Sequence, residues 1–123
     1  MRIGTRKESS AVAVLDLEGS LTLTADVTCV SNMLDELLQL GVRRILLSMA
    51  TVSTVDRAGV GRLLEFREQT VSAGGCLKMA GLNGRVLAAL DQFQLTKVFG
   101  VYESEESAVA SFFEQPHNCL LYT

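Results

Sequence analysis

The chain has 123 residues, of which 48% are hydrophobic and 20% charged, and its net charge is −3. This length and apolar content predict one domain with a core of its own, and no apolar run reaches the roughly 18 residues that a membrane-spanning helix needs. The acidic balance argues against nucleic acid as a partner, because nucleic-acid binding requires a basic face.

The first strands are expected near the N-terminus. Residues 2–7 alternate weakly and predict an edge strand, followed by a turn at 8–10. The nearly continuous apolar run at 11–17 is typical of a strand covered on both faces. Glu18-Gly19-Ser20 interrupts this run, and the alternation continues to residue 23. An N-terminal hairpin over 2–23 would add antiparallel edge strands to the sheet.

A helix and a second buried strand are expected next. Thr24 or Asp26 can cap the helix, and Gly41 stands where a left-handed residue ends it. The strand is expected over Arg43 to Ala50. The apolar residues at helical spacing are Val27, Val30, Leu34, Leu37 and Leu38.

Two further helix–strand units follow the segment 52–56. One helix closes at Gly74-Gly75 and leads into a strand over Cys76–Ala80, which Gly81 stops. Asn83 can cap another helix, and a fourth buried strand is expected at 99–102. Apolar positions assigned to the inner faces of these two helices are Val60, Leu63, Leu64, Val71, Val86, Leu87, Leu90 and Phe93.

The last helix is expected to begin at Ser104, with Glu105 and Glu106 in a first turn that favours carboxylates. Its inward residues are Ala108, Val109 and Phe112. Strands thus alternate with helices, which predicts an α/β fold with a mostly parallel sheet. We expect a single domain over residues 1–115 and a C-terminal tail over 116–123.

Metal and redox sites are not predicted. The cysteines Cys29, Cys76 and Cys119 are widely spaced without a C-x-x-C motif, and Cys76 is interpreted as a small core residue. The only histidine, His117, lies in the polar tail, which makes a metal site or a catalytic triad a poor interpretation. The N-terminus has basic residues but no apolar segment long enough for a secretory signal, so a cytoplasmic protein is expected.

The stretch from Val52 to Leu64 is the most informative part of the chain. It predicts the end of a strand, a short loop and the first turn of a helix, with Asp56 as N-cap at the positive end of the helix dipole. Gly59 and Gly61 leave this turn without side chains. Either a phosphate or a partner protein approaches closely there, or the glycines only let the helix pack against its own sheet.

Catalytic motifs are missing from the sequence. There is no phosphate-binding G-x-x-x-x-G-K-[ST], no G-x-G-x-x-G and no G-x-S-x-G. Hydroxyls gather near the predicted strand ends, at Ser48, Thr51, Ser53 and Thr54, but none has a histidine or lysine base in its local sequence; they could equally satisfy backbone groups. Asp16 and Glu18 are interpreted as one solvated face rather than a catalytic pair.

Several short segments occur in a characteristic order. They are Leu17-Glu18-Gly19-Ser20-Leu21-Thr22-Leu23, Arg44-Ile45-Leu46-Leu47, Val55-Asp56-Arg57-Ala58-Gly59-Val60-Gly61, Ala73-Gly74-Gly75-Cys76-Leu77, Gly81-Leu82, and Val98-Phe99 through Ser104-Glu105-Glu106 to Ala108. This ordered set, from Val12 to Phe112, resembles the STAS domain, the family of bacterial anti-sigma-factor antagonists. In the family pattern, the first of these segments reads "L-x-G-x-L-D-L" and the third reads "I-D-S-S-G-L-G".

The resemblance implies a mixed, mostly parallel sheet of four or five strands with four or five helices. It implies no catalytic activity and no cofactor, and a protein partner, an anti-sigma factor that is also a serine kinase. Docking would use the segment 53–61, and phosphorylation of the second serine of "D-S-S-G" would block it. The implied partner-binding residues are Thr22, Thr24, Ser53, Thr54, Asp56, Arg57, Ala58, Gly59 and Arg62.

This sequence departs from the family pattern at the switch itself. Ala58 stands where the phosphorylated serine is expected and Arg57 where the first serine is, while Ser48 and Thr22 replace family aspartates. The hypothesis is an antagonist fixed in its docking-competent form, because position 58 cannot be phosphorylated. In the alternative hypothesis, Thr54 or Ser53 serves as a relocated phosphate acceptor. Arg57 would meet an acidic partner surface or a nucleotide phosphate, or would simply be a solvated side chain.

Two other functions stay open at this stage. STAS domains also serve as cytoplasmic subunits of lipid ABC or anion transport complexes, and a small ligand or nucleotide could bind near Ser53, Thr54 and Gly59. A homodimer is also left open.

Overall fold

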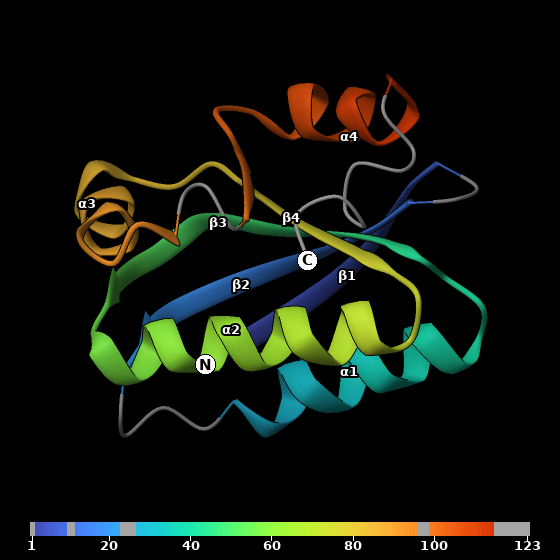
Figure 1. Cartoon of the computed structure of the whole chain (residues 1–123), viewed down its shortest axis with the longest axis horizontal. Helices are drawn as coiled ribbons and strands as arrows, with labels where there is room; N and C mark the ends of the chain where they lie inside the picture. The colour runs from blue at the N-terminus through green and yellow to red at the C-terminus, as the bar shows by residue number, and fades with distance from the viewer. Residues whose placement is uncertain (1, 10–11, 23–26, 96–98, 115–123) are drawn as a thin grey trace.

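The protein folds around a five-stranded sheet, seen in Figure 1. The structure is a computed structural model and describes residues 2–9, 12–22, 27–95 and 99–114. The strand order in the sheet is the order along the chain, β1-β2-β3-β4-β5. β1 is antiparallel to β2, and the other neighbours are parallel, as the α/β pattern predicts. The strands are β1 (Arg2–Ser9), β2 (Val12–Leu21), β3 (Arg44–Val55), β4 (Cys76–Ala80) and β5 (Gly100–Tyr102).

Helices cover both faces of the sheet. They are α1 (Thr28–Gln39), α2 (Arg57–Ser72), α3 (Gly84–Gln92) and α4 (Glu105–Glu114). In Figure 1, α1 and α2 run side by side under one face, α3 lies at the left, above the start of α2, and α4 lies across the opposite face. No helix in the described ranges has the length and apolarity to cross a membrane. The mixed, mostly parallel sheet with four helices confirms the expected fold class.

The core consists of two apolar clusters, because the central strands are buried on both faces. The larger cluster lies under α1, α2 and α3, and includes Leu15, Leu47 and Phe66. The smaller one lies under α4, and comprises Val12, Val14, Leu46, Ala80, Ala108 and Phe112. Cys76 packs against the smaller cluster, half-buried, as a small core residue would, and it is also disulfide-bonded.

Most helix ends obey the local signals in the sequence. Asp56 and Asn83 cap α2 and α3 with their side chains, and Ser104 Oγ accepts from the backbone N–H of Ser107 at 3.2 Å. Gly41 and Gly74 follow their helices with positive φ values of 91° and 84°, which glycine adopts without strain. α1 differs, because its N-cap is Val27, without a side-chain cap; the predicted caps Thr24 and Asp26 lie outside the described residues.

Three strands are longer than the sequence predicts. β1 continues through the predicted turn residues Glu8 and Ser9, and β2 continues through Glu18-Gly19-Ser20 to Leu21. β3 continues beyond Ala50 to Val55, so residues 51–55 form a strand and not a loop. The reason is that the prolonged β2 offers them a partner. Two register shifts against β2 absorb the additional residues of β3.

Two leucines assigned to the core are exposed. Leu64 is 38% and Leu87 is 41% exposed, whereas Phe66 and Thr70 complete the buried stripe of α2. Each exposed leucine directly follows a buried residue, Leu63 or Val86, and a helix turns the next side chain about 100° away. β5 is half-buried rather than buried, because it forms an edge of the sheet.

A lysine is buried in the face that α4 covers. Lys78 is only 2% exposed, although the sequence placed it in an apolar strand. Its Nζ donates to Ser111 Oγ at 2.6 Å and approaches Tyr102 Oη at 3.4 Å. The same Nζ lies 4.6 Å from the ring centroid of Phe112. Hydroxyls and aromatic faces therefore replace the water that a charged ammonium needs.

We expect the Ser111 hydroxyl to be worth more to stability than the lysine charge. Ser111→Ala should lower the free energy of unfolding by about 1.5–3 kcal/mol, because it removes a hydrogen bond from a buried ammonium. Lys78→Met should change it by less than about 1 kcal/mol, because the charge leaves together with its requirement for partners. Urea unfolding at pH 7 measures both, with Ser72→Ala at the exposed end of α2 as control. A larger loss for Lys78→Met than for Ser111→Ala would contradict this account.

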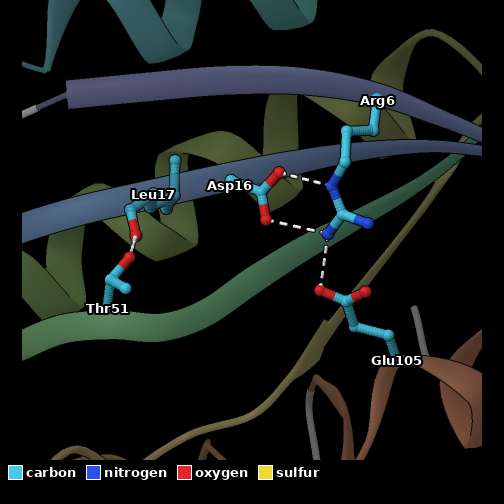
Figure 2. Close-up of polar contacts among 5 residues, drawn as sticks. All are labelled: Arg6, Asp16, Leu17, Thr51 and Glu105. Carbon is cyan, nitrogen blue, oxygen red and sulfur yellow. Dashed lines mark hydrogen bonds and ion pairs between the residues drawn. The ribbon is translucent and has the colours of Figure 1, made fainter.

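An ion-pair cluster joins the N-terminal hairpin to α4, as Figure 2 shows. The Arg6 guanidinium donates to both carboxylate oxygens of Asp16, at 2.6 and 2.8 Å, and to Glu105 Oε1 at 2.7 Å. Asp16 is therefore an ion-pair partner, and the pair remains partly exposed to solvent, in agreement with the solvated face predicted for Asp16 and Glu18. The hydrogen bonds from Arg6 lower the pKa of the Asp16 carboxyl, against the opposing effect of partial burial.

This lowered pKa predicts a loss of stability in acid. A carboxyl with a lower pKa in the folded state stabilises the protein above its unfolded pKa, about 3.9, and the contribution disappears as the pH falls through the folded value. Because Asp16 is partly exposed, Asp16→Asn should cost only about 0.5–1 kcal/mol at pH 7. The difference from the parent protein should shrink toward zero near pH 2. Urea unfolding across this range measures it, with the exposed Glu36→Gln as control; a difference that persists unchanged in acid would contradict the assignment.

Candidate functional site

The segment singled out by sequence lies where β2, β3 and α2 meet. The register places Ser20 beside Thr54 and Leu21 beside Val55, at the carboxyl ends of the two strands. The backbone N–H of Asp56 then donates to the Leu21 carbonyl oxygen at 3.2 Å. Thr22, half-buried, directly follows Leu21 and so comes next to the start of α2. The structure thus brings Thr22 together with the segment 53–56; Thr24 lies outside the described residues.

Asp56 fixes the first turn of α2. Its Oδ1 accepts from the backbone N–H of Gly59 at 2.8 Å, as predicted for an N-cap. α2 begins at the next residue, so the strand passes into the helix through Asp56 alone and the predicted loop does not exist. The exposed carboxylate also carries negative charge at the positive end of the helix dipole.

The two glycines of this turn have different roles. A Cβ built on Gly59 would lie 1.9 Å from the Leu21 carbonyl oxygen, so only glycine lets α2 approach β2 this closely. A Cβ on Gly61 would meet no atom within 4 Å. The packing interpretation therefore holds for Gly59. At Gly61 there is open space, and the approach of a phosphate or a partner there stays a prediction.

The hydroxyls near the strand ends satisfy one another and the backbone. Ser53 Oγ lies 3.1 Å from Ser20 Oγ and donates to the Gly19 carbonyl at 3.4 Å. Thr51 Oγ1 donates to the Leu17 carbonyl at 2.6 Å, shown in Figure 2. None of these contacts supplies Ser53 or Thr51 with a histidine, lysine or carboxylate base. Ser48 lies apart from them, buried in β3 opposite Asp16.

Two arginines give the start of α2 a positive charge. The exposed Arg57 guanidinium lies 5.7 Å from the ring centroid of Phe93, just beyond α3, so it is oriented and not simply solvated. Arg62 is half-buried and its Nη1 lies 3.4 Å from Glu65. Ala58 is half-buried between them in sequence. Sequence reasoning missed Ser20 and Phe93 as members of this site, because only the strand register and the packing of α3 bring them here.

We call the exposed part of residues 53–62 the α2-start surface. It combines the hydroxyls of Ser53 and Thr54, the capping carboxylate of Asp56 and the guanidinium of Arg57 around the small residues Ala58 and Gly61. Such a surface can form hydrogen bonds and ion pairs with a protein that approaches closely. The contacts above give it no activated nucleophile.

Comparison with known protein families gives one match, to the model described as the STAS domain, over residues 5–108. The chain belongs to the STAS family. A comparison with curated protein sequences found no match.

Several solved structures, among them the three that follow, have a fold similar to that of this STAS domain. A candidate anti-sigma factor antagonist from Thermotoga maritima is 20% identical, with a TM-score of 0.77 over 89% of this chain and 92% of that one. The phosphorylated form of the Bacillus cell fate determinant SpoIIAA is 17% identical, with a TM-score of 0.67 over 89% and 98%. A sulfate transporter family protein from Wolinella succinogenes is 22% identical, with a TM-score of 0.66 over 86% and 88%. At these identities the likeness concerns the fold.

Replacement by alanine should have opposite effects on stability at Gly59 and at Gly61. Gly59→Ala should lower the free energy of unfolding by at least about 2 kcal/mol, because the new methyl collides with the Leu21 carbonyl. Gly61→Ala should raise it by about 0.5–1 kcal/mol, because alanine favours the helix and meets no atom there. Urea unfolding of both variants measures the difference. Equal effects of the two substitutions would show that the close approach at Gly59 is not needed.

Proposed function

We propose that this STAS domain is an anti-sigma-factor antagonist that docks on an anti-sigma factor of the serine-kinase type through its α2-start surface. The observation that carries the proposal is the exposed first turn of α2, which Asp56 and Gly59 hold against the end of β2. Support comes from the family match and from similar structures described as anti-sigma factor antagonists. The partner-binding residues would be those of segment 53–62 with the neighbouring Thr22.

Docking by this chain would lack the usual phosphorylation switch. Ala58, which the family resemblance aligns with the phosphorylated serine, has no hydroxyl. A phosphate at this position would add a charge of about −1.5 to −2 two residues from the Asp56 carboxylate, and would block docking by repulsion and desolvation. With alanine here, the domain would stay competent to dock. Its regulation would then come from its abundance or from its partner.

The function would be binding and not catalysis. The hydroxyls of Ser53 and Thr51 form hydrogen bonds with Ser20 and with backbone carbonyls. An activated serine needs a base within hydrogen-bonding distance, which those contacts do not provide. The positive charge of Arg57, oriented by Phe93, would face an acidic patch on the partner.

A second candidate function is that of an accessory subunit in a transport complex. The observation in its favour is the similar fold of a sulfate transporter family protein. The partner recovered with the domain separates the two candidates, because an antagonist would bring an anti-sigma factor and an accessory subunit would bring a transporter ATPase or permease.

The decisive experiment recovers the tagged protein from its native cells, with and without added ATP, and identifies bound proteins by mass spectrometry. An anti-sigma factor with a kinase-type ATP-binding fold is the expected partner. Transporter subunits in its place would move the function to the transport class. The intact mass of the recovered domain should show no phosphate. A mass raised by one phosphate would mean that another hydroxyl, with Thr54 and Ser53 the first to be mutated, carries the switch.

Placing a carboxylate at the centre of the α2-start surface should abolish docking. Ala58→Glu should weaken binding of the recovered partner at least tenfold, or about 1.4 kcal/mol, because the new carboxylate would be desolvated and would repel the acidic patch that Arg57 is proposed to face. Ala110→Glu, an exposed alanine on α4 across the sheet, is the matched control and should bind as the parent does. Isothermal titration calorimetry measures both. Unchanged binding by Ala58→Glu would place the docking surface elsewhere.

A further inference from the structure

Helix α3 is apolar on two faces, which its role in the core does not explain. Val86 and Leu90 are fully buried in the larger cluster and anchor the helix to the sheet. Leu87 and Ala88, on another side of the same turns, are exposed, and Leu87 is 41% exposed. A surface helix normally places polar residues opposite its buried stripe. Exposed apolar residues that are grouped mark a surface for binding.

These exposed residues form one wall of a groove. The groove has a volume of about 630 Å³ and lies between α3 and the edge strand β5. Leu82 and Val101, both partly buried against the larger cluster, contribute to its lining, as does Tyr102. Tyr102 packs against the smaller cluster, and its ring centroid lies 5.2 Å from the Nζ of the buried Lys78. The groove is therefore built on anchored residues and is large enough for several apolar side chains.

The rim of the groove is acidic. Asp91 of α3 and Glu103, directly after β5, both border it and both are exposed. Neither carboxylate forms an ion pair or a side-chain hydrogen bond with any residue in the described part of the chain. Two carboxylates beside one apolar groove repel phosphates and fatty-acid head groups. They attract a ligand that combines apolar side chains with positive charge.

We propose that the groove between α3 and β5 binds an amphipathic segment of a partner protein, a helix with a leucine-type apolar stripe flanked by lysine or arginine. The apolar stripe would cover Leu87 and Ala88, and the basic residues would pair with Asp91 and Glu103. This site is distinct from the α2-start surface, with which it shares no residue. It would let the domain hold a second partner while the first is docked.

A titration followed by NMR tests the proposal. The probe is a synthetic helical peptide of leucine and lysine, added to the ¹⁵N-labelled full chain at physiological salt. We expect chemical-shift changes concentrated at residues 87, 88, 91 and 101–103. A peptide with glutamate in place of each lysine should bind at least tenfold more weakly. Shifts spread evenly over the surface, or centred on residues 53–62, would overturn the proposal.

Matched variants distinguish specific binding in the groove from nonspecific binding elsewhere on the surface. Leu87→Gln should weaken binding of the leucine–lysine peptide at least tenfold, whereas Leu40→Gln, at the still more exposed leucine that ends α1, should leave it unchanged. The double variant Asp91→Lys with Glu103→Lys should also weaken it at least tenfold, and Glu36→Lys with Glu68→Lys, of equal charge change elsewhere, should not. Equal losses in the matched pairs would overturn the proposal. Ala58→Glu, aimed at the other surface, should leave peptide binding intact, so failure of the proposed docking function would not affect this result.

Discussion

The Leu21 carbonyl at the end of β2 is the contact on which the α2-start surface depends. It accepts the backbone N–H of Asp56, and it lies where any side chain at position 59 would have to go. The two constraints fix both the direction and the closeness of α2. Arg57, Ala58 and Arg62 then take their places from the helix geometry. A surface made of exposed side chains is thus determined by a backbone contact beneath it.

The family alignment and the physical structure assign complementary roles to the same short segment. The glycine that the motif requires is explained by packing against β2, without any ligand. Arg57 and Ala58, where the resemblance predicts a departure from the family pattern, are respectively exposed and half-buried. The neighbours that complete the site, Ser20 and Phe93, come from other elements of the fold. Substitutions at positions 57 and 58 can therefore leave undisturbed the contacts that hold the helix in place.

Sequence reasoning succeeded where the signal is local. The caps Asp56, Asn83 and Ser104 each act within three residues of their own position, and β4 has the predicted bounds. It failed for residues 51–55, because Thr51, Ser53 and Thr54 look like loop residues until β2 is known to extend beside them. Contacts between residues that are far apart in the sequence could not be predicted either. The ion pair between Arg6 and Glu105 joins residues near the two ends of the described chain, and no periodicity in the sequence predicts it.

The exposed leucines show a subtler limit. Helical spacing finds apolar residues, but Leu63 and Leu64, or Val86 and Leu87, are adjacent in sequence, and the pattern alone does not say which of each pair faces the sheet. The packing of each helix on its own strand decides. In α3 this leaves Leu87 beside the groove, so a residue assigned to the core becomes part of the second surface proposed to bind a protein.

The agreement between strand order and chain order has a consequence for how the protein forms. Every strand after β1 pairs with the strand that precedes it in the sequence. Each new strand can therefore pair with a strand that has already been synthesised. No early segment has to wait exposed for a late one to complete the sheet. As the chain leaves the ribosome, β1 and β2 can form first, and each helix–strand unit can add in turn to the growing edge. The last of these elements to join is the short β5 with α4, so the wall of the groove at β5 is completed only after the other four strands have been made.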